Sequence, residues 1–246
     1  MTATSGIAPA AMITREFPGA APMSQFLTRQ SAWLRAQGFD PEDALAISAT
    51  CRDEILAPLR AQVRTHWHRA FDFSSLSGLP LAGLTGARAA LGHAPQTGDR
   101  VEMVVFALPH IGVLADGAVG QAMRRGRVDP TTACGSLVAA IEQSQTDPIG
   151  AMDPDDPEQS LVRARLLAEI PDLARCDLRT VTTTVRDLMV ADLWRMLQGI
   201  SDTDQVDLAL VSGLVVHGPD GLDFVVPGTC RVRTRGRVVD SAGAYD

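Results

Sequence analysis

The chain lacks a long run of apolar residues. No stretch of about 18 consecutive apolar residues occurs in the 246-residue sequence, so we expect no membrane-spanning helix. Residues 1–22 are rich in Ala, Thr, Ser, Gly and Pro, and they lack the basic segment followed by an apolar segment that marks a secretory signal. We therefore expect residues 1–22 to form a loose N-terminal arm, either a leader or a contact with a partner subunit. Residues 23–246 should form one domain.

Basic residues are scarce relative to acidic ones. The chain has 22 basic and 29 acidic residues, which gives a formal net charge of −7. No basic stripe is present that would neutralise the phosphates of a nucleic acid, so we expect no nucleic-acid partner. The densest basic stretch is residues 123–127, with the sequence MRRGR. We interpret it as a solvated turn or a local anion site.

Cysteine is too rare for a disulfide framework. Four cysteines in a chain of 246 residues do not resemble the dense, regularly spaced cysteines of small secreted domains. A reducing compartment, the cytoplasm, is therefore the expected location. In that setting the thiols are expected to be metal ligands, nucleophiles or buried core residues.

Predicted strands and helices alternate along the chain. The composition, 46% apolar and 21% charged, is that of a globular protein with a sizeable core. Strands are predicted over residues 44–50, 101–108, 207–216, 222–226 and 230–239. Helices are predicted over residues 23–38, 53–67, 84–92, 129–145, 160–170 and 181–197. This order indicates a single α/β domain over residues 23–246, with a mainly parallel central sheet flanked by helices.

Residues able to bind a metal follow the two most convincing strands and precede a later helix. Cys51 and Asp53 come directly after the strand 44–50, and His110 follows the strand 101–108. Cys134 lies near a predicted helix start, where amide groups favour the thiolate. Ligands bind at the carboxyl ends of strands in open α/β sheets. Two thiols, an imidazole and a carboxylate make a zinc site whose fourth position is able to open. The alternative is that Cys51 and Cys134 are ordinary buried thiols and that His110 bonds to backbone.

The remaining histidines and cysteines have simpler interpretations. His93 either shuttles protons or is a turn histidine bonded to backbone. His217 lies at the tip of a predicted hairpin and needs no function. The other four are interpreted as surface histidines or core thiols: His66, His68, Cys176 and Cys230.

Five short motifs occur in the order typical of one family. They are Cys-Arg-Asp-Glu (51–54), Phe-Ser-Ser-Leu-Ser-Gly-Leu-Pro (73–80), Gly-His-Ala-Pro (92–95), Pro-His-Ile-Gly (109–112) and Ala-Cys-Gly (133–135). Together they resemble the limiting-CO2-inducible protein B/C family, whose active members are the theta-class carbonic anhydrases. The resemblance covers roughly residues 45–145 by motif.

The resemblance implies a fold similar to that of beta carbonic anhydrases, a homodimer and a zinc ion. The implied zinc ligands are Cys51, His110 and Cys134. Asp53 is then a catalytic residue that either takes the fourth position on the metal or releases it to water.

The arginine that would hold Asp53 is not evident from the motif. In beta carbonic anhydrases an arginine four residues after the first cysteine holds the aspartate, but here that position is Ile55. Arg52 is our candidate for this catalytic role, with Arg60 and Arg88 as alternatives.

The resemblance implies reversible hydration of CO2 to bicarbonate by zinc-bound hydroxide. Because this substrate is small and apolar, a narrow pocket suffices, and Phe73 and Leu76 are candidate walls. One alternative is a cysteine hydrolase with Cys51 as nucleophile and His110 as base. Another is a non-catalytic zinc- or bicarbonate-binding protein. CO2 or bicarbonate is the expected ligand, and no membrane partner is expected.

Overall fold

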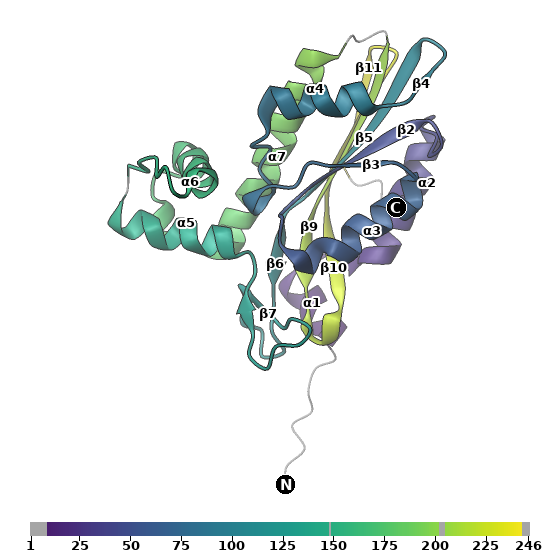
Figure 1. Ribbon diagram of the computed structural model, residues 1–246. Coiled ribbons are helices and arrows are strands. Elements are labelled where there is room, and N and C mark those ends of the chain that lie inside the picture. Colours follow the sequence, from purple (N-terminus) through teal and green to yellow (C-terminus); the bar gives the residue numbers. More distant parts are fainter. Residues whose placement is uncertain (1–8, 148, 202–204, 243–246) are drawn as a thin grey trace.

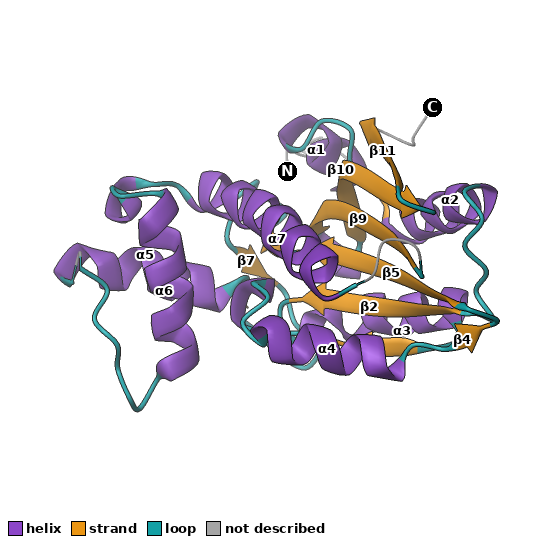
Figure 2. Ribbon diagram, turned by 90° about the horizontal axis from the view of Figure 1, so that it is seen from above, coloured by secondary structure: helices purple, strands orange, loops and turns teal. Residues whose placement is uncertain are grey.

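A nine-stranded sheet forms the centre of the computed structural model, which describes residues 9–147, 149–201 and 205–242 (Figure 1). Two layers of helices enclose it. The helices α4 and α7 cover one face and α2 and α3 the other, while α5 and α6 project away from the sheet (Figures 1 and 2). The helices are α1 (Pro9–Glu16), α2 (Met23–Ala36), α3 (Ala57–Trp67), α4 (Gly83–His93), α5 (Gly135–Thr146), α6 (Pro157–Glu169) and α7 (Leu178–Ile200). Short 3-10 turns span Glu54–Leu56, Leu76–Gly78, Leu173–Arg175 and Pro219–Gly221.

The central strands are parallel, as predicted. They lie in the order β3 (Ala70–Asp72), β2 (Ala44–Thr50), β5 (Arg100–Leu108) and β9 (Val206–His217). The short strand β6 (His110–Gly112) extends the parallel pairing with β9. Antiparallel strands are added at the margins: β10 (Asp223–Thr234), β1 (Ala21–Pro22), β11 (Arg237–Ala242) and β4 (Gln96–Thr97). A separate ribbon pairs β7 (Gln121–Ala122) with β8 (Thr131–Thr132).

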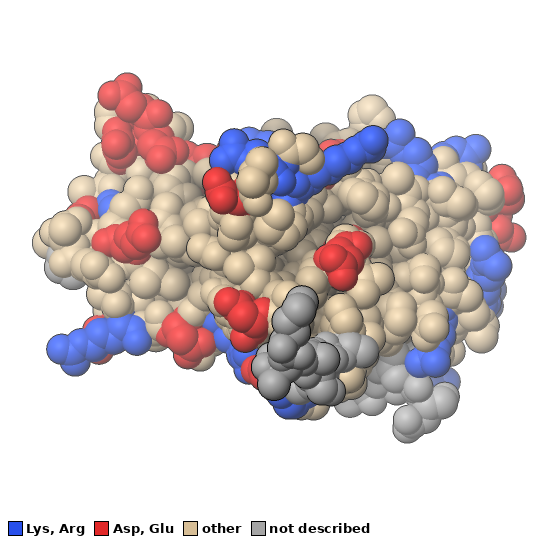
Figure 3. Space-filling model, turned by 90° about the horizontal axis from the view of Figure 1, so that it is seen from below, with Lys and Arg blue, Asp and Glu red and all other residues tan. Residues whose placement is uncertain are grey.

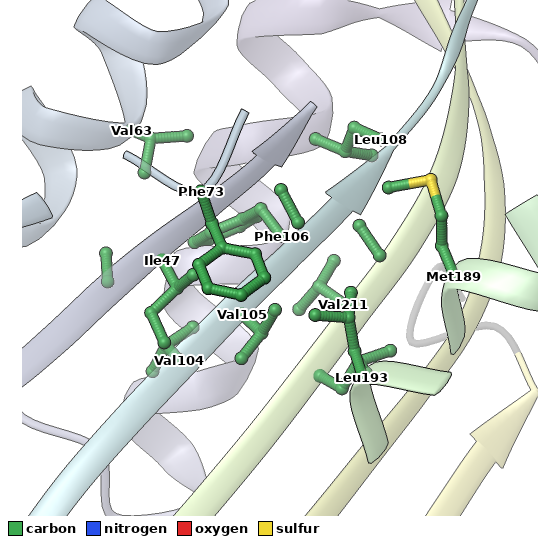
Figure 4. Close-up of a cluster of buried hydrophobic side chains, with 14 of the residues drawn as sticks. Ile47, Val63, Phe73, Val104, Val105, Phe106, Leu108, Met189, Leu193 and Val211 are labelled. Atoms are coloured by element: carbon green, nitrogen blue, oxygen red, sulfur yellow. The ribbon is translucent and has the colours of Figure 1, made fainter. Parts of the chain in front are cut away.

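Burial on both faces of the sheet explains why polar and apolar residues do not alternate along the central strands. Every residue of β2 is buried, because helices cover both faces of this part of the sheet. Figure 4 shows Ile47 of β2, Val105 of β5 and Val211 of β9 in one apolar cluster with Leu193 of α7. Burial of each such side chain stabilises the fold by roughly 1.5–3 kcal/mol. The α/β architecture therefore rests on this two-sided burial.

Two element boundaries differ from the predictions for local reasons. The strand predicted over 230–239 is divided between the end of β10, which also includes most of the strand predicted over 222–226, and β11. A turn with positive φ at Arg235 (48°) and Gly236 (75°) reverses the chain between them. The helix predicted from residue 129 begins at Gly135, because Thr131 and Thr132 pair with β7 instead. The strand predicted over residues 44–50 has the predicted bounds.

Residues 9–22 are not the loose arm predicted for residues 1–22. Helix α1 buries Met12 and Ile13, and β1 pairs with β10 at the sheet margin. Phe17 is also buried, with the Arg179 guanidinium 4.6 Å from its ring centroid. Met12 and Ile13 of this short helix, together with Phe17 just after it, pack against apolar side chains of the β9–β10 hairpin. Residues 1–8 lie outside the described part of the chain.

None of the helices in the described part of the chain is both long enough and apolar enough to cross a membrane.

Charge is unevenly distributed on the surface. Figure 3 shows basic side chains in a band along one edge of the face seen from below, with acidic side chains scattered elsewhere.

Candidate metal centre

The end of β2 presents Cys51 and Asp53. Cys51 is 4% exposed and forms an isolated bridge with Ser75, while the Arg52 amide donates to the Ser75 carbonyl (2.9 Å). Asp53 precedes the 3-10 turn, and its carboxylate accepts a hydrogen bond from the Ile55 amide (3.1 Å). The predicted helix start is therefore this turn, followed by α3.

His110 lies where the pairing of β5 with β9 continues, past Pro109, into β6. Pro109 has no amide hydrogen to continue the ladder of β5, and its carbonyl accepts from Val215 of β9 (2.9 Å). Residues 110–112 then pair with β9 as β6, in register His110 with Val215. His110 is fully buried. The pairing of β6 with β9 therefore holds the backbone of His110 in the sheet, and its imidazole is buried.

Gly112 allows the β7 segment to approach the backbone of β6 closely. A Cβ at position 112 would lie 2.3 Å from the Gln121 carbonyl oxygen, which is closer than any real contact. We expect Gly112→Ala to lower the free energy of unfolding by roughly 1–3 kcal/mol, because the backbone must shift. Gly92→Ala is the control. Gly92 lies in helix α4, and a Cβ added to it would have no other atom within 4 Å. That variant should be neutral or stabilising by up to about 1 kcal/mol. Urea unfolding of both proteins tests this, and equal stability would contradict it.

Cys134 stands at the N-cap position of α5 and is 1% exposed. The residue before it is held on both sides, because the Ala133 amide donates to Gly120 (2.9 Å) and its carbonyl accepts from Gly112 (3.0 Å). The chain segments that carry His110 and Cys134 are therefore joined directly by backbone hydrogen bonds.

The structure brings the three residues Cys51, His110 and Cys134 together. Their donor atoms all lie within 4.8 Å of one another, and the two Sγ atoms are 3.5 Å apart. The Nε2 atom of His110 is buried without a hydrogen-bond partner. An unpartnered buried polar atom is costly, and a metal ion bound by this set would satisfy it. The donor set therefore fits a metal ion.

The two thiols differ in their ease of ionisation. The hydrogen bond from Cys134 lowers the pKa of the Cys51 thiol to about 4, and nearby His110 acts in the same direction against the effect of burial. The same contact with Cys51, together with burial, raises the pKa of the Cys134 thiol. One thiolate is thus favoured before any metal binds.

Arg124, not Arg52, holds Asp53. Its guanidinium donates to both carboxylate oxygens of Asp53, at 2.5 and 2.8 Å. Burial raises the pKa of the Asp53 carboxyl, but Arg124 and the nearby His110 outweigh it and lower that pKa overall. The Oδ2 atom of Asp53 lies 3.8 Å from His110 Nε2. An ionised carboxylate therefore lies beside the candidate metal ligands.

The three arginines proposed from the sequence lie elsewhere. Arg52 pairs with Glu158 (2.7 Å), because adjacent side chains at this turn point in different directions. Arg60 donates to the Cys51 carbonyl (3.0 Å), and Arg88 is exposed on α4. The prediction that Arg52 pairs with Asp53 is wrong. Arg124 belongs to the basic stretch MRRGR (123–127), which the sequence marked as a turn or an anion site but did not connect with Asp53.

His217 is not an idle residue at a hairpin tip. It is 2% exposed, and its Nε2 lies 3.1 Å from the Nδ1 of His110. Its own Nδ1 lies 2.7 Å from the Oδ1 of Asp223. Burial lowers the pKa of the His217 imidazole, partly offset by Asp223. No local sequence pattern signals this contact, which joins residues 107 positions apart.

The other candidates lie outside the cluster. The His93 ring lies 5.6 Å from the Phe71 ring, centroid to centroid, at the end of α4. Phe73 is buried in the apolar core shown in Figure 4, and Leu76 is partly buried against that core. Their role as pocket walls remains a prediction.

Comparisons with known proteins place the chain in a family. The family model for limiting CO2-inducible proteins B/C beta carbonic anhydrases matches residues 20–234. The crystal structure of PtLCIB4, a homolog of the limiting CO2-inducible protein LCIB, is 27% identical with a TM-score of 0.82, over 94% of this chain and 99% of that one. The structure of LCIB itself has a TM-score of 0.77 at 24% identity, over 92% of this chain and 96% of that one, and supports the fold alone. No curated protein matches the sequence. The match over nearly the whole domain, together with the shared fold, shows that this chain belongs to the limiting CO2-inducible protein B/C family of beta-type carbonic anhydrases.

Proposed function

We propose that the protein is a zinc-dependent carbonic anhydrase that interconverts CO2 and bicarbonate. The observation that carries this proposal is the buried cluster of Cys51, His110 and Cys134, with an unpartnered His110 Nε2, beside an ionised Asp53. Its membership in a family described as carbonic anhydrases supports the same chemistry.

Zinc suits this donor set. Two thiolates and one imidazole are the borderline-soft ligands that zinc prefers, and three protein ligands are typical of catalytic sites. When bound, the ion would supply hydroxide from an acidified water, and the two thiolates, which offset its double charge, would place that ionisation above neutral pH.

Asp53 and Arg124 would control what enters the remaining position. Arg124 occupies both oxygens of Asp53 and so holds the carboxylate back from the cluster. The Arg124 guanidinium is itself fixed, because it donates to the Thr131 hydroxyl (2.5 Å) and the Thr132 carbonyl (2.9 Å). Held in this way, Asp53 would accept a hydrogen bond from the attacking oxygen and orient it toward CO2. CO2 is small and apolar, so a narrow, largely dry site suffices.

The cysteine hydrolase alternative fits the geometry less well. Cys51 is nearly inaccessible, and its Sγ lies 3.5 Å from a second thiol, Cys134, for which a hydrolase has no use. A homodimer and a cytoplasmic location remain predictions from the resemblance and the cysteine content.

The proposal predicts CO2 hydration that rises above neutral pH. Stopped-flow measurement between pH 6 and 9, on protein with its zinc content quantified, should show a rate above that of buffer that increases with pH. A pH-independent rate across this range would contradict the proposed ionisation. Absence of hydration in protein with about one zinc per chain would favour a non-catalytic bicarbonate-binding protein. Absence of both would refute the ligand assignment.

A further inference from the structure

The His110 imidazole has a hydrogen-bonding neighbour at Nδ1, while its Nε2 has no partner and belongs to the cluster with the two thiols. Nε2 is directed at the two thiols, and Nδ1 lies 3.1 Å from the Nε2 of His217. The two rings are nearly perpendicular, with an interplanar angle of 78° and centroids 5.1 Å apart. His217 in turn contacts Asp223 at 2.7 Å. The result is an array of a carboxylate and two imidazoles in successive contact, with the His110 ring at the candidate metal position.

One placement of protons satisfies the whole array. A histidine that binds a metal through Nε2 must carry its hydrogen on Nδ1. In His110 that hydrogen is donated to the Nε2 of His217, which must then be unprotonated. The hydrogen of His217 therefore resides on Nδ1, where it is donated to the carboxylate of Asp223. Reversing the order would leave Asp223 without a donor from His217.

Strand pairing fixes the backbone positions of the residues in this array. His217 is the last residue of β9 and Asp223 the first of β10, and the two are direct cross-strand partners. The turn Pro219–Gly221 closes this hairpin. His217 is also the β-sheet partner of Gly112, two residues after His110. Both imidazoles thus sit on paired segments of the same sheet.

We propose that His217 and Asp223 are positioning residues that fix the tautomer and the ring orientation of His110 for metal binding. This inference rests on the metal site of the proposed function and extends it to residues outside the ligand set. Carboxylates and other acceptors behind a ligating histidine commonly fix its tautomer and ring orientation. An apolar side chain would fill the same buried position without the cost of burying polar groups, so packing alone does not account for His217.

The direct test is the affinity of the purified chain for Zn²⁺, measured by competition with a chromophoric chelator. We expect His217→Ala to weaken zinc binding about 10- to 100-fold and Asp223→Ala about 10-fold. His217→Gln should stay within a few-fold of wild type, because its amide oxygen accepts from His110 and its amide nitrogen donates to Asp223. Asp220→Asn is the matched control, an exposed acid in the same hairpin turn, and should not change the affinity.

Two further readouts separate positioning from folding. The melting temperature of the metal-free proteins reports any general loss of structure, and the absorption spectrum of the Co²⁺-substituted proteins reports ligand geometry. We expect that spectrum to change in His217→Ala and Asp223→Ala but not in His217→Gln or Asp220→Asn. Zinc affinity within twofold of wild type in Asp223→Ala and in His217→Ala would overturn the proposal. Should His217→Ala fail to fold, Asp223→Ala and His217→Gln decide by the same criteria. Because zinc affinity is measured without CO2, failure of the proposed activity leaves this test intact.

Discussion

Replacing Cys51 with serine is expected to abolish zinc binding and to reduce CO2 hydration to the rate of buffer. The Cys51 Sγ is one of the three donor atoms that lie within 4.8 Å of one another. Among the described residues, Cys51, His110 and Cys134 are the only group of three or more His, Cys, Asp or Glu residues that could hold a metal ion. A serine hydroxyl is not ionised at neutral pH, so it neither binds zinc strongly nor offsets its charge. Zinc content by atomic absorption and stopped-flow hydration measure the two losses.

Cys176→Ser is the matched control for Cys51→Ser. Cys176 is partly exposed and lies outside the candidate cluster, so its replacement should change neither the zinc content nor the rate. The ligand assignment would be wrong if Cys51→Ser retained about one zinc per chain and hydrated CO2 as fast as wild type.

Replacing Arg124 with glutamine is expected to leave zinc bound but to reduce hydration about 10- to 100-fold. Without the two hydrogen bonds from the guanidinium, the Asp53 carboxylate, 3.8 Å from His110 Nε2, is free to move onto the metal and block its open position. The rate per bound zinc is the relevant measurement. Arg125→Gln, an exposed neighbour, is the control and should retain the rate.

A double substitution tests whether Arg124 acts through Asp53. If the two residues act as one unit, Arg124→Gln with Asp53→Asn should lose no more activity than the more damaging single variant. Losses that multiply would show that Arg124 has a separate role.

The same pair should contribute to stability in a pH-dependent way. Loss of Arg124 leaves a largely buried carboxylate unpaired, which costs about 1–3 kcal/mol in the free energy of unfolding. Because the pKa of Asp53 is lowered in the folded protein, this stabilisation is full above the ordinary carboxyl pKa of about 3.9 and is lost as the pH falls below it. The difference between wild type and Arg124→Gln should therefore be the same at pH 7 and pH 5 but shrink on further acidification. A difference that grew below pH 4 would contradict this sign.

Much of the candidate site was predictable because it follows local patterns. The apolar run 44–50 ends at Cys51, and the run 101–108 ends at Pro109 and His110, as in the structure. Cys134 stands at the start of a helix, also as predicted. In each case residues within one segment determine where a strand or helix stops, and the motifs point to the same positions.

The residues that sequence reasoning missed act across long separations. Arg124 reaches Asp53 over 71 positions, and His217 reaches His110 over 107. Residues 1–22 were expected to form a loose arm, either a leader or a contact with a partner subunit, because they are rich in Ala, Thr, Ser, Gly and Pro. The structure describes residues 9–22 of this segment. The few apolar side chains of residues 9–22 nevertheless pack against the β9–β10 hairpin, which forms only when the chain folds.

The sequence by itself determined the α/β class, the ends of the ligand-bearing strands and the three candidate ligands, since hydrophobic periodicity and motif order are properties of local segments. Only the tertiary structure decided that Arg124 pairs with Asp53 and that His217, with Asp223, contacts the Nδ1 side of His110. The physical reason is that a charge or hydrogen-bond partner is selected by distance in space, over a few ångströms. Strand order and register set that distance, whereas the chain carries no local signal of it.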